Sequence, residues 1–321
     1  MMRIPRPVTR QEVEQSRPAR FSVDPYQPVG WLIEEEYSRN RRVEKTAVVF
    51  LANRECPLRC VMCDLWKQTL VGRTPAGAVV AQLEGVLPEL RAATQIKLYN
   101  HGNFFDPLAV PMADRRAIAQ RMEGFHTVIV ENHPRFCGPG CAEFRSWLPE
   151  ATQLEVAMGL EVANDLWLRW LHKQMTVADF CQAAQWLVRQ GIFVRAFVLL
   201  GLPGTEAAES LHWALRSVRE AFRAGADVVS IIPLRSGNGI LDRLADEGWR
   251  WPSRLVLLET ALFLALQEKQ GRVFADLWQV ENWEACPECR SRRLENLCYM
   301  NSTQQPSEPV ACRCSTPITI P

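Results

Sequence analysis

Three cysteines stand close together in the segment NRECPLRCVMCDLW (residues 53–66). Cys56, Cys60 and Cys63 have the spacing C-x3-C-x2-C and follow an apolar run, TAVVFLA (46–52), that is typical of a buried strand. Such cysteines could be core residues, disulfide partners, zinc ligands or ligands of an iron–sulfur cluster. A structural zinc site takes four protein ligands, whereas three thiolates on one loop can hold a [4Fe–4S] cluster and leave one iron open. The spacing therefore favours a cluster.

A second set of cysteines lies near the end of the chain. Cys286 and Cys289 form a C-x2-C pair, Cys312 and Cys314 form a C-x-C pair, and the segment RSRRLENLCYMN between them has a helical pattern. Four thiolates suit a closed structural zinc site, and the same ligands could hold a second [4Fe–4S] cluster. Both alternatives remain open at the level of sequence.

Composition indicates a globular protein without a strong electrostatic preference for one partner. The chain has 321 residues, 47% of them hydrophobic, and a formal net charge of +1, so nothing predicts a general attraction to nucleic acid or acidic membranes. No apolar signal-peptide core opens the sequence, and the most apolar helical run (255–267) is too short to span a bilayer. Eleven cysteines in such a chain favour metal binding or catalysis over disulfides. We expect a cytoplasmic protein that does not bind membranes.

The middle of the chain alternates between β-rich runs and segments with helical periodicity. Six strands separated by helices predict parallel βαβ units, which fit either a partial barrel or a doubly wound sheet. In both folds the reactive end is where the strands run into the following loops, and the first cysteine segment lies there. We expect an N-terminal arm (1–44), a barrel (45–233) and a cysteine-containing C-terminal extension (234–321). The predicted strands are 46–52, 95–100, 126–132, 153–161, 192–201 and 226–233.

The segment CPLRCVMC resembles the cysteine signature of the radical S-adenosylmethionine (SAM) enzymes. The runs LYNHGNFFDP, VENHPRF and LEVAMGLE resemble the Elongator catalytic-subunit branch, and most closely the archaeosine-forming radical SAM lyase group. The resemblance covers about 46–233 and implies a partial (β/α)6 TIM-type barrel with the cluster on its first loop. It also implies that the open iron binds SAM, whose reductive cleavage gives a 5′-deoxyadenosyl radical. Met62 departs from the aromatic residue that is common before the last cysteine.

The resemblance also assigns several positions to the cofactor. Gly102 and Asn103, in NHGNFFDP, stand where the family has a Gly-Gly-Glu-type turn that holds the methionyl amino group. Glu131 carries the match to the strand-three motif. Glu161 stands where this branch places a residue near the ribose hydroxyls, and a carboxylate is a suitable acceptor for a diol.

Three further residues complete the predicted site. Trp66 is close enough to the cysteines to flank the adenine, and Gly201 begins a GLPG turn that resembles the glycine motif supporting the cofactor. Arg195 interrupts the apolar strand IFVRAFVLL, and an arginine buried there needs an anionic partner. That partner could be a carboxylate of SAM or of the substrate. It could equally be an internal ion pair with Glu155 or Glu161.

The leading functional hypothesis is a radical SAM enzyme of lyase, oxidoreductase or transferase type. Its substrate would be a modified tRNA base or a small metabolite or natural-product intermediate, and its reductant a flavodoxin or a ferredoxin. The alternative is a zinc or iron–sulfur nucleic-acid-binding module without radical chemistry, in which RSRRL (290–294) would contact phosphate. The lack of a basic stripe argues against the module. A simple electron carrier would not need six βα units.

Overall fold

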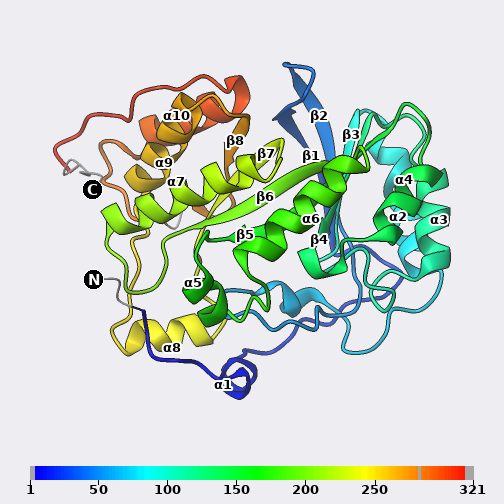
Figure 1. The fold of residues 1–321 in the computed structure, drawn as a ribbon, viewed down its shortest axis with the longest axis horizontal. Coiled ribbons are helices and arrows are strands. Elements are labelled where there is room, and N and C mark those ends of the chain that lie inside the picture. Colours follow the sequence, from blue (N-terminus) through cyan, green and yellow to red (C-terminus); the bar gives the residue numbers. More distant parts are fainter. Residues whose placement is uncertain (1–3, 281–282, 315–321) are drawn as a thin grey trace.

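A curved eight-stranded sheet is the centre of the computed structural model, which describes residues 4–280 and 283–314. The strands lie side by side in chain order, and all neighbours are parallel except β1 and β2, which are antiparallel. Figure 1 shows the sheet curling with helices around it, as a partial TIM-type barrel requires. The predicted fold class is therefore confirmed. The strands are β1 (Gly30–Tyr37), β2 (Val43–Phe50), β3 (Gln95–Tyr99), β4 (Thr127–Asn132), β5 (Gln153–Glu161), β6 (Phe193–Leu200), β7 (Val228–Pro233) and β8 (Arg272–Ala275).

Two of these strands come from the segments that flank the predicted barrel. β1 belongs to the predicted N-terminal arm, and its sequence GWLIEEEY reads as polar because three glutamates occupy it. β8 belongs to the C-terminal extension and has only 4 residues, too few for a periodic signal. The other six strands match their predicted positions closely.

Helices follow the strands and cover the outer face of the sheet (Figure 1). A capping box starts α6, since the Thr176 hydroxyl accepts a hydrogen bond from the Asp179 backbone N–H and the Asp179 carboxylate accepts one from the Thr176 backbone N–H. None of the helices in the described ranges is long and apolar enough to cross a membrane. The helices are α1 (Arg10–Gln15), α2 (Ala78–Leu90), α3 (Met112–Gln120), α4 (Pro139–Trp147), α5 (Asp165–Trp170), α6 (Val177–Arg189), α7 (Ala207–Arg223), α8 (Ile240–Asp246), α9 (Leu255–Gln267) and α10 (Arg290–Thr303), with short 3-10 turns η1 (Leu65–Gln68) and η2 (Pro134–Phe136).

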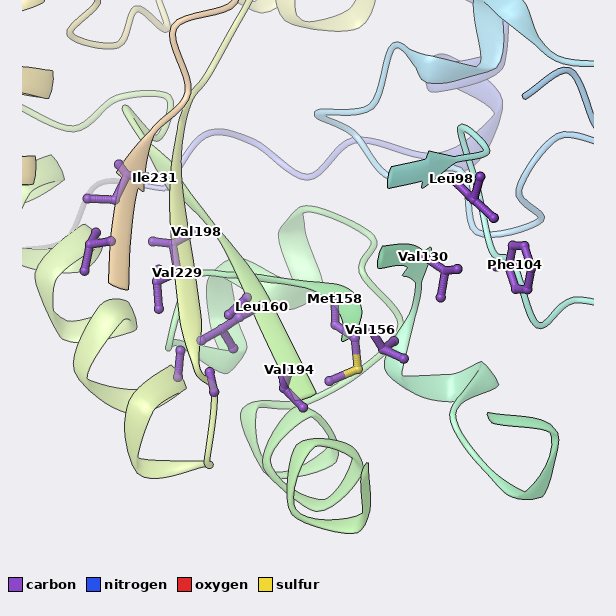
Figure 2. Packing of buried hydrophobic residues seen from close by; sticks show 14 of the residues in the cluster. Leu98, Phe104, Val130, Val156, Met158, Leu160, Val194, Val198, Val229 and Ile231 are labelled. Atoms are coloured by element: carbon purple, nitrogen blue, oxygen red, sulfur yellow. The ribbon is translucent and has the colours of Figure 1, made fainter. Parts of the chain in front are cut away.

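The core lies between the outer face of the sheet and the helices. Val156, Met158, Val194 and Val198 belong to its largest cluster and are fully buried there (Figure 2). Because side chains alternate along a strand, their neighbours point to the inner face of the sheet. The two faces of the sheet differ in chemistry, because the inner face carries buried charged residues. These residues are Lys97, Glu155, Glu161 and Arg195.

Candidate functional site

The first three cysteines lie on the loop that follows β2, at the carboxyl end of the parallel strands. All three are free thiols; Cys60 is buried, and Cys56 and Cys63 are partly exposed. The loop is held by its neighbours. The Asn238 side-chain amide donates to the Val61 carbonyl at 2.7 Å, and the Val61 N–H donates to the Leu171 carbonyl at 2.9 Å. The cysteines are thus presented on a fixed loop at the predicted reactive end.

The turn after β3 contacts this loop directly. Asn103 Nδ2 donates to Cys56 Sγ at 3.2 Å, and Asn103 Oδ1 accepts from the His133 N–H at 2.8 Å. A Cβ on Gly102 would lie 3.7 Å from the Cβ of Cys56, so the backbone here runs close against the cysteine. Gly102 and Asn103 therefore lie beside the cysteine loop, where the sequence predicted a cofactor-binding turn.

A buried ion pair lies near Cys56 and Cys60 of the same loop. Lys173 Nζ is 2.6 Å from Glu161 Oε1, and both side chains are buried. A Cβ on Gly159 would fall 2.0 Å from Glu161 Oε1 and 2.5 Å from Lys173 Nζ, so only glycine leaves room for the pair. Burial raises the pKa of the Cys60 thiol to about 12, and the nearby positive charge of Lys173 partly opposes this. Lys173 therefore places a cation where thiolates would need one.

Lys173 was missed by the sequence reasoning. It lies in the turn LHKQMT (171–176), which has no motif of its own. The only local signal is Gly159 inside strand β5, because a glycine in a strand interior often marks the close approach of another group. His133, just after β4, also contacts this turn. Its Nε2 lies 2.9 Å from the Lys173 carbonyl oxygen and its Nδ1 accepts from the Arg135 N–H at 3.1 Å, so both ring nitrogens make structural contacts.

Glu131, near the end of β4, is the carboxylate with the most unusual environment in this region. Its Oε2 accepts from the His101 N–H at 3.1 Å. Burial raises its pKa to about 7, and hydrogen bonds from the Asn100 and His101 backbone only partly offset the effect. A carboxyl group with this pKa changes its charge near neutral pH.

This environment predicts a pH-dependent contribution to stability. Between the ordinary carboxyl pKa of 4.5 and the raised value of about 7, the folded protein holds the Glu131 proton and the unfolded chain does not. The contribution of Glu131 to the free energy of unfolding should therefore fall as pH rises through this window, by about 1–3 kcal/mol in total, and level off above it. Burial lowers the pKa of His101 and His133, which changes the stability in the opposite direction, so the effect of Glu131 is measured as a difference between variants. In urea denaturation of the SAM-free protein at pH 5, 6, 7 and 8, the stability of wild type relative to Glu131→Gln should fall as pH rises. The exposed-site variant Glu150→Gln should follow wild type at each pH; a difference between wild type and Glu131→Gln that does not change with pH would disprove the assignment.

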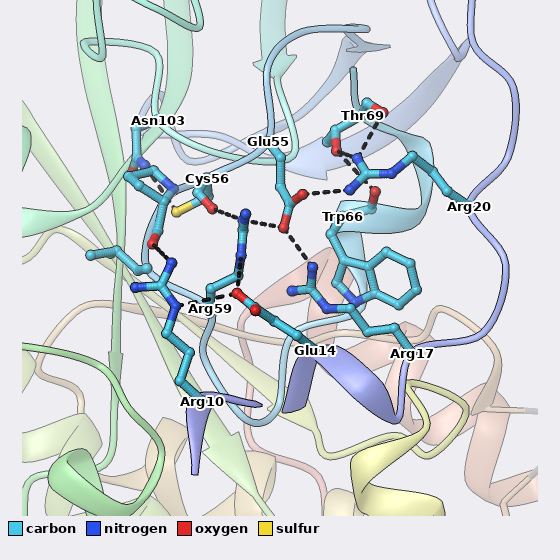
Figure 3. A network of polar contacts seen from close by, with 12 residues as sticks. Arg10, Glu14, Arg17, Arg20, Glu55, Cys56, Arg59, Trp66, Thr69 and Asn103 are labelled. Carbon is cyan, nitrogen blue, oxygen red and sulfur yellow. Dashed lines mark hydrogen bonds and ion pairs between the residues drawn. The ribbon is translucent and has the colours of Figure 1, made fainter. Parts of the chain in front are cut away.

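The N-terminal segment packs against the cysteine loop through arginines (Figure 3). Glu55, next to Cys56, is paired with Arg17, Arg20 and Arg59. Burial works against the charged form of Glu55, yet hydrogen bonds from Arg20 and Arg17 hold its pKa below the usual range. This contact links the arm to the loop that carries the cysteines.

Trp66 and Gly201, which the sequence predicts to bind the cofactor, contact other parts of the protein. Trp66 is buried in η1, and the Arg17 guanidinium lies 4.5 Å from its ring centroid (Figure 3). Gly201 has φ +95°, and a Cβ there would lie 3.0 Å from the Pro252 carbonyl oxygen. At least one face of the Trp66 ring therefore packs against the N-terminal arm, and Gly201 allows two loops to pack closely. Their roles toward a cofactor stay predictions.

Arg195 lies at the other end of the barrel. It is the third residue of β6, and its guanidinium pairs with Glu36 at 2.7 Å and with Glu155 at 2.6 Å. Lys97 joins the same group at 2.5 Å from Glu36. Of the two alternatives for Arg195, the structure forms the internal ion pair with Glu155, with Glu36 as a further partner. The prediction that Arg195 binds the cofactor is therefore corrected. Its guanidinium N–H groups bind Glu36 and Glu155 at the amino end of the strands.

The four tail cysteines come together after β8. The Sγ atoms of Cys286, Cys289, Cys312 and Cys314 all lie within 4.8 Å of one another. In the described part of the chain, this is the one group of His, Cys, Asp or Glu side chains gathered closely enough to surround a single metal ion. The convergence of these two cysteine pairs, predicted from their spacing, is confirmed.

Comparison with solved structures identifies similar folds. SuiB from Streptococcus suis, solved with S-adenosylmethionine bound, aligns with a TM-score of 0.52 and 10% identity over 74% of this chain and 51% of SuiB. Methylornithine synthase (PylB) aligns with a TM-score of 0.50 and 14% identity over 84% of this chain and 85% of PylB. The chain thus spans about half the length of SuiB, and at these identities the likeness concerns the fold. No protein-family model and no curated protein sequence matches the chain.

Proposed function

We propose that this protein is a radical SAM enzyme whose [4Fe–4S] cluster is held by Cys56, Cys60 and Cys63. The observation that carries the proposal is the C-x3-C-x2-C loop after the first parallel strand, at the carboxyl end of a partial barrel. The fold is shared with the radical SAM enzymes SuiB and PylB, and SuiB was solved with SAM bound. When bound, the cluster and SAM would supply a 5′-deoxyadenosyl radical that abstracts hydrogen from a substrate.

The residues around the loop suit an anionic group of thiolates. Asn103 directs an N–H at Cys56 Sγ, and Lys173 places a buried positive charge near Cys56 and Cys60. Hydrogen-bond donors and cations near sulfur stabilise the thiolate form that iron binds. Gly102 keeps the space beside Cys56 free of a side chain. These side chains would therefore hold the ligands deprotonated and in place.

Glu161 has a special position in this arrangement. Its backbone adopts φ +64°, which non-glycine residues seldom adopt, and its Oε1 binds Lys173. Strain of this kind often accompanies a functional position. We infer that Glu161, held by Lys173, presents its carboxylate to the ribose hydroxyls of SAM.

The role of Glu161 gives a binding prediction. Loss of a buried hydrogen-bond partner costs about 1–3 kcal/mol, so Glu161→Ala should weaken SAM binding about tenfold to a hundredfold. Calorimetry on the reconstituted protein measures the affinity, with Glu150→Ala, an exposed glutamate just before the same strand, as the control. Equal affinities in wild type and Glu161→Ala would refute the ribose role, provided that both proteins bind the same amount of iron.

The proposed activity can be tested directly. After anaerobic reconstitution with iron and sulfide, the protein should convert SAM to 5′-deoxyadenosine and methionine when a chemical reductant is added. A protein that binds about four irons on the loop cysteines but forms no 5′-deoxyadenosine would favour an electron carrier. A protein that binds nucleic acid without cleaving SAM would favour the nucleic-acid-binding module, which the barrel fold does not favour.

The substrate class is the finer part of the proposal. The resemblance of VENHPRF and LEVAMGLE to the archaeosine-forming group favours a modified tRNA base, with carbon–nitrogen cleavage as the reaction. A small metabolite or natural-product intermediate is the second candidate, because a net charge of +1 gives no general attraction to RNA. In the cytoplasm a flavodoxin or ferredoxin would deliver the electron. Deuterium transfer from a labelled substrate into 5′-deoxyadenosine would separate the two substrate classes.

A further inference from the structure

The geometry of the four tail thiols limits what they can hold. Cys286 Sγ lies 3.4 Å from Cys289 Sγ and 3.5 Å from Cys312 Sγ, and Cys289 Sγ lies 3.5 Å from Cys314 Sγ. Four sulfurs at about 2.3 Å from one tetrahedral zinc ion are about 3.8 Å apart. In a [4Fe–4S] cluster each thiolate binds a different iron, which separates the sulfurs by about 6 Å.

We propose that Cys286, Cys289, Cys312 and Cys314 bind a single zinc ion and that this ion fixes α10 over the open edge of the barrel. No two of the four sulfurs are more than 4.8 Å apart, which fits one ion and is too close for a cubane cluster. Closed coordination by four cysteines is the usual structural zinc site, with no position left for substrate. The tail motif is therefore structural, in contrast to the three-cysteine loop.

A second layer of contacts around the sulfurs supports a metal centre. Arg293, whose side chain is 1% exposed, donates from Nε to Cys289 Sγ at 3.2 Å. The same guanidinium pairs with Glu259 of α9, which is fully buried. Glu259 Oε1 also accepts from Asn296 Nδ2 at 2.8 Å and from the Val310 N–H at 3.0 Å. A buried arginine on a sulfur is the kind of partner that a negatively charged zinc–thiolate centre needs.

These contacts connect the metal centre to three separate segments. Cys289 and Arg293 lie at the start of α10, Glu259 lies in α9, and Val310 lies in the tail that returns past α10. Arg254, just before α9, donates to the Cys314 carbonyl at 3.1 Å. One ion would therefore join the beginning of α10, the start of α9 and the returning tail.

The far end of α10 covers β8, the last strand of the sheet. The Val273 N–H donates to Gln304 Oε1 at 2.8 Å, and Gln304 Nε2 donates back to the Val273 carbonyl at 2.9 Å. Asn301 makes the same double contact with Ala275, at 2.9 Å in both directions. Side-chain amides thus replace the missing neighbouring strand and satisfy the free edge of β8.

Helix α10 also packs against β1, the strand at the opposite edge of the sheet. Arg272 Nη1 in β8 donates to the Tyr37 carbonyl in β1 at 3.3 Å, so the two edges approach each other at this point. The helix therefore covers the seam of the partial barrel. Fixing its first turn to a metal would keep the seam closed.

Metal analysis of the whole chain tests the site independently of the proposed enzyme activity. Wild type and the variant Cys56→Ala/Cys60→Ala/Cys63→Ala should each contain one zinc per chain, with zinc X-ray absorption giving four sulfurs at about 2.3 Å. Cys286→Ser should lose the zinc and retain the iron of the loop cluster. Cys298→Ser, on the exposed side of α10, is the matched control and should retain both metals. Iron in the loop variant, as one ion or four, would overturn the zinc assignment.

Thiol alkylation of the wild-type protein avoids reliance on a variant that fails to fold. Cys298 should react at once, whereas the four tail cysteines should react only after a chelator removes the ion. Removal of the ion should also speed hydrogen exchange at the Val273 and Ala275 amides at least about tenfold, because α10 no longer covers them. Rapid alkylation of all four tail thiols without a chelator, or a disulfide between any two of them, would contradict the proposal.

The contact from Arg293 provides a separate test of the second layer. Loss of such a partner typically weakens metal binding by 10–100-fold, so Arg293→Gln should lower zinc affinity by about that factor in chelator competition. Arg292→Gln, on the exposed side of the same turn, should leave the affinity unchanged. Equal affinities in the two variants would show that the arginine serves packing only.

Discussion

Replacing Cys56, Cys60 or Cys63 with alanine should each lower the rate of SAM cleavage by about a thousandfold or more, equivalent to at least about 4 kcal/mol of transition-state stabilisation. The physical reason is that each thiolate holds a different iron, so the loss of one leaves an incomplete cluster. The loop itself is held by contacts from Asn238, which a cysteine substitution does not remove. The fold should therefore survive while the activity is lost. Production of 5′-deoxyadenosine and bound iron per chain measure the effect.

The matched control for these variants is Cys181→Ala. Cys181 is a partly buried thiol on α6, outside both cysteine groups, and its substitution should leave iron content and SAM cleavage unchanged. A triple variant of the loop cysteines that still forms 5′-deoxyadenosine would refute the proposed function. Loss of activity together with loss of the far-ultraviolet circular dichroism signal would show instead that the cysteines maintain the fold.

The six strands predicted from sequence share one property, a short and mostly apolar, β-rich run bounded by turn residues. Parallel strands of a barrel give this signal because both of their faces are buried, although some of them carry a charged residue on the inner face. Strand β1 does not give this signal, since Glu34, Glu35 and Glu36 are consecutive. Glu34 and Glu36 point to the inside of the barrel, where Lys97 pairs with both. The glutamates that make β1 hard to recognise in the sequence also form the ion pairs with Lys97 that stabilise the strand in the structure. Prediction of this strand would require knowledge of its partner, which lies 61 residues further along the chain in the case of Glu36 and Lys97.

The candidate site shows the same division between local and long-range information. Cys56, Cys60 and Cys63 could be predicted because one loop carries all three ligands. Lys173 could not, because its position beside Glu161 depends on how the turn after α5 folds back over β5. The contact of Arg17 with Trp66 was equally invisible, because it joins the N-terminal arm to the cysteine loop.

The sequence left the anionic partner of Arg195 open. An arginine in an apolar strand implies an anionic partner, and the sequence alone does not distinguish a cofactor from an internal carboxylate. The structure provides Glu36 and Glu155, and burial of all three groups makes each depend on the others. These carboxylates hold the pKa of Arg195 well above its ordinary value despite its burial. The ion pairs lower the pKa of Glu36, although burial alone would raise it.

The substitution Arg195→Met should therefore destabilise the protein by about 3–5 kcal/mol, because removal of one partner leaves two buried carboxylates with too little positive charge. A change of this size corresponds to a thermal midpoint lower by about 4–8 °C in a protein of this length. Arg189→Met, an exposed arginine in the helix before the same strand, is the matched control and should leave the midpoint unchanged. Differential scanning calorimetry of the variants under anaerobic conditions measures the shift.

A second substitution distinguishes the ion-pair network from a cofactor-binding role. In Arg195→Met/Glu155→Leu one uncompensated carboxylate is removed as well, so part of the lost stability should return, as expected for residues that share one network. If Arg195 instead bound SAM, the single variant would retain its thermal midpoint and lose affinity for SAM, and the second substitution would not help. The position of Arg195 at the start of β6, opposite the end that carries the cysteines, argues for recovery of stability with unchanged SAM affinity in the folded protein.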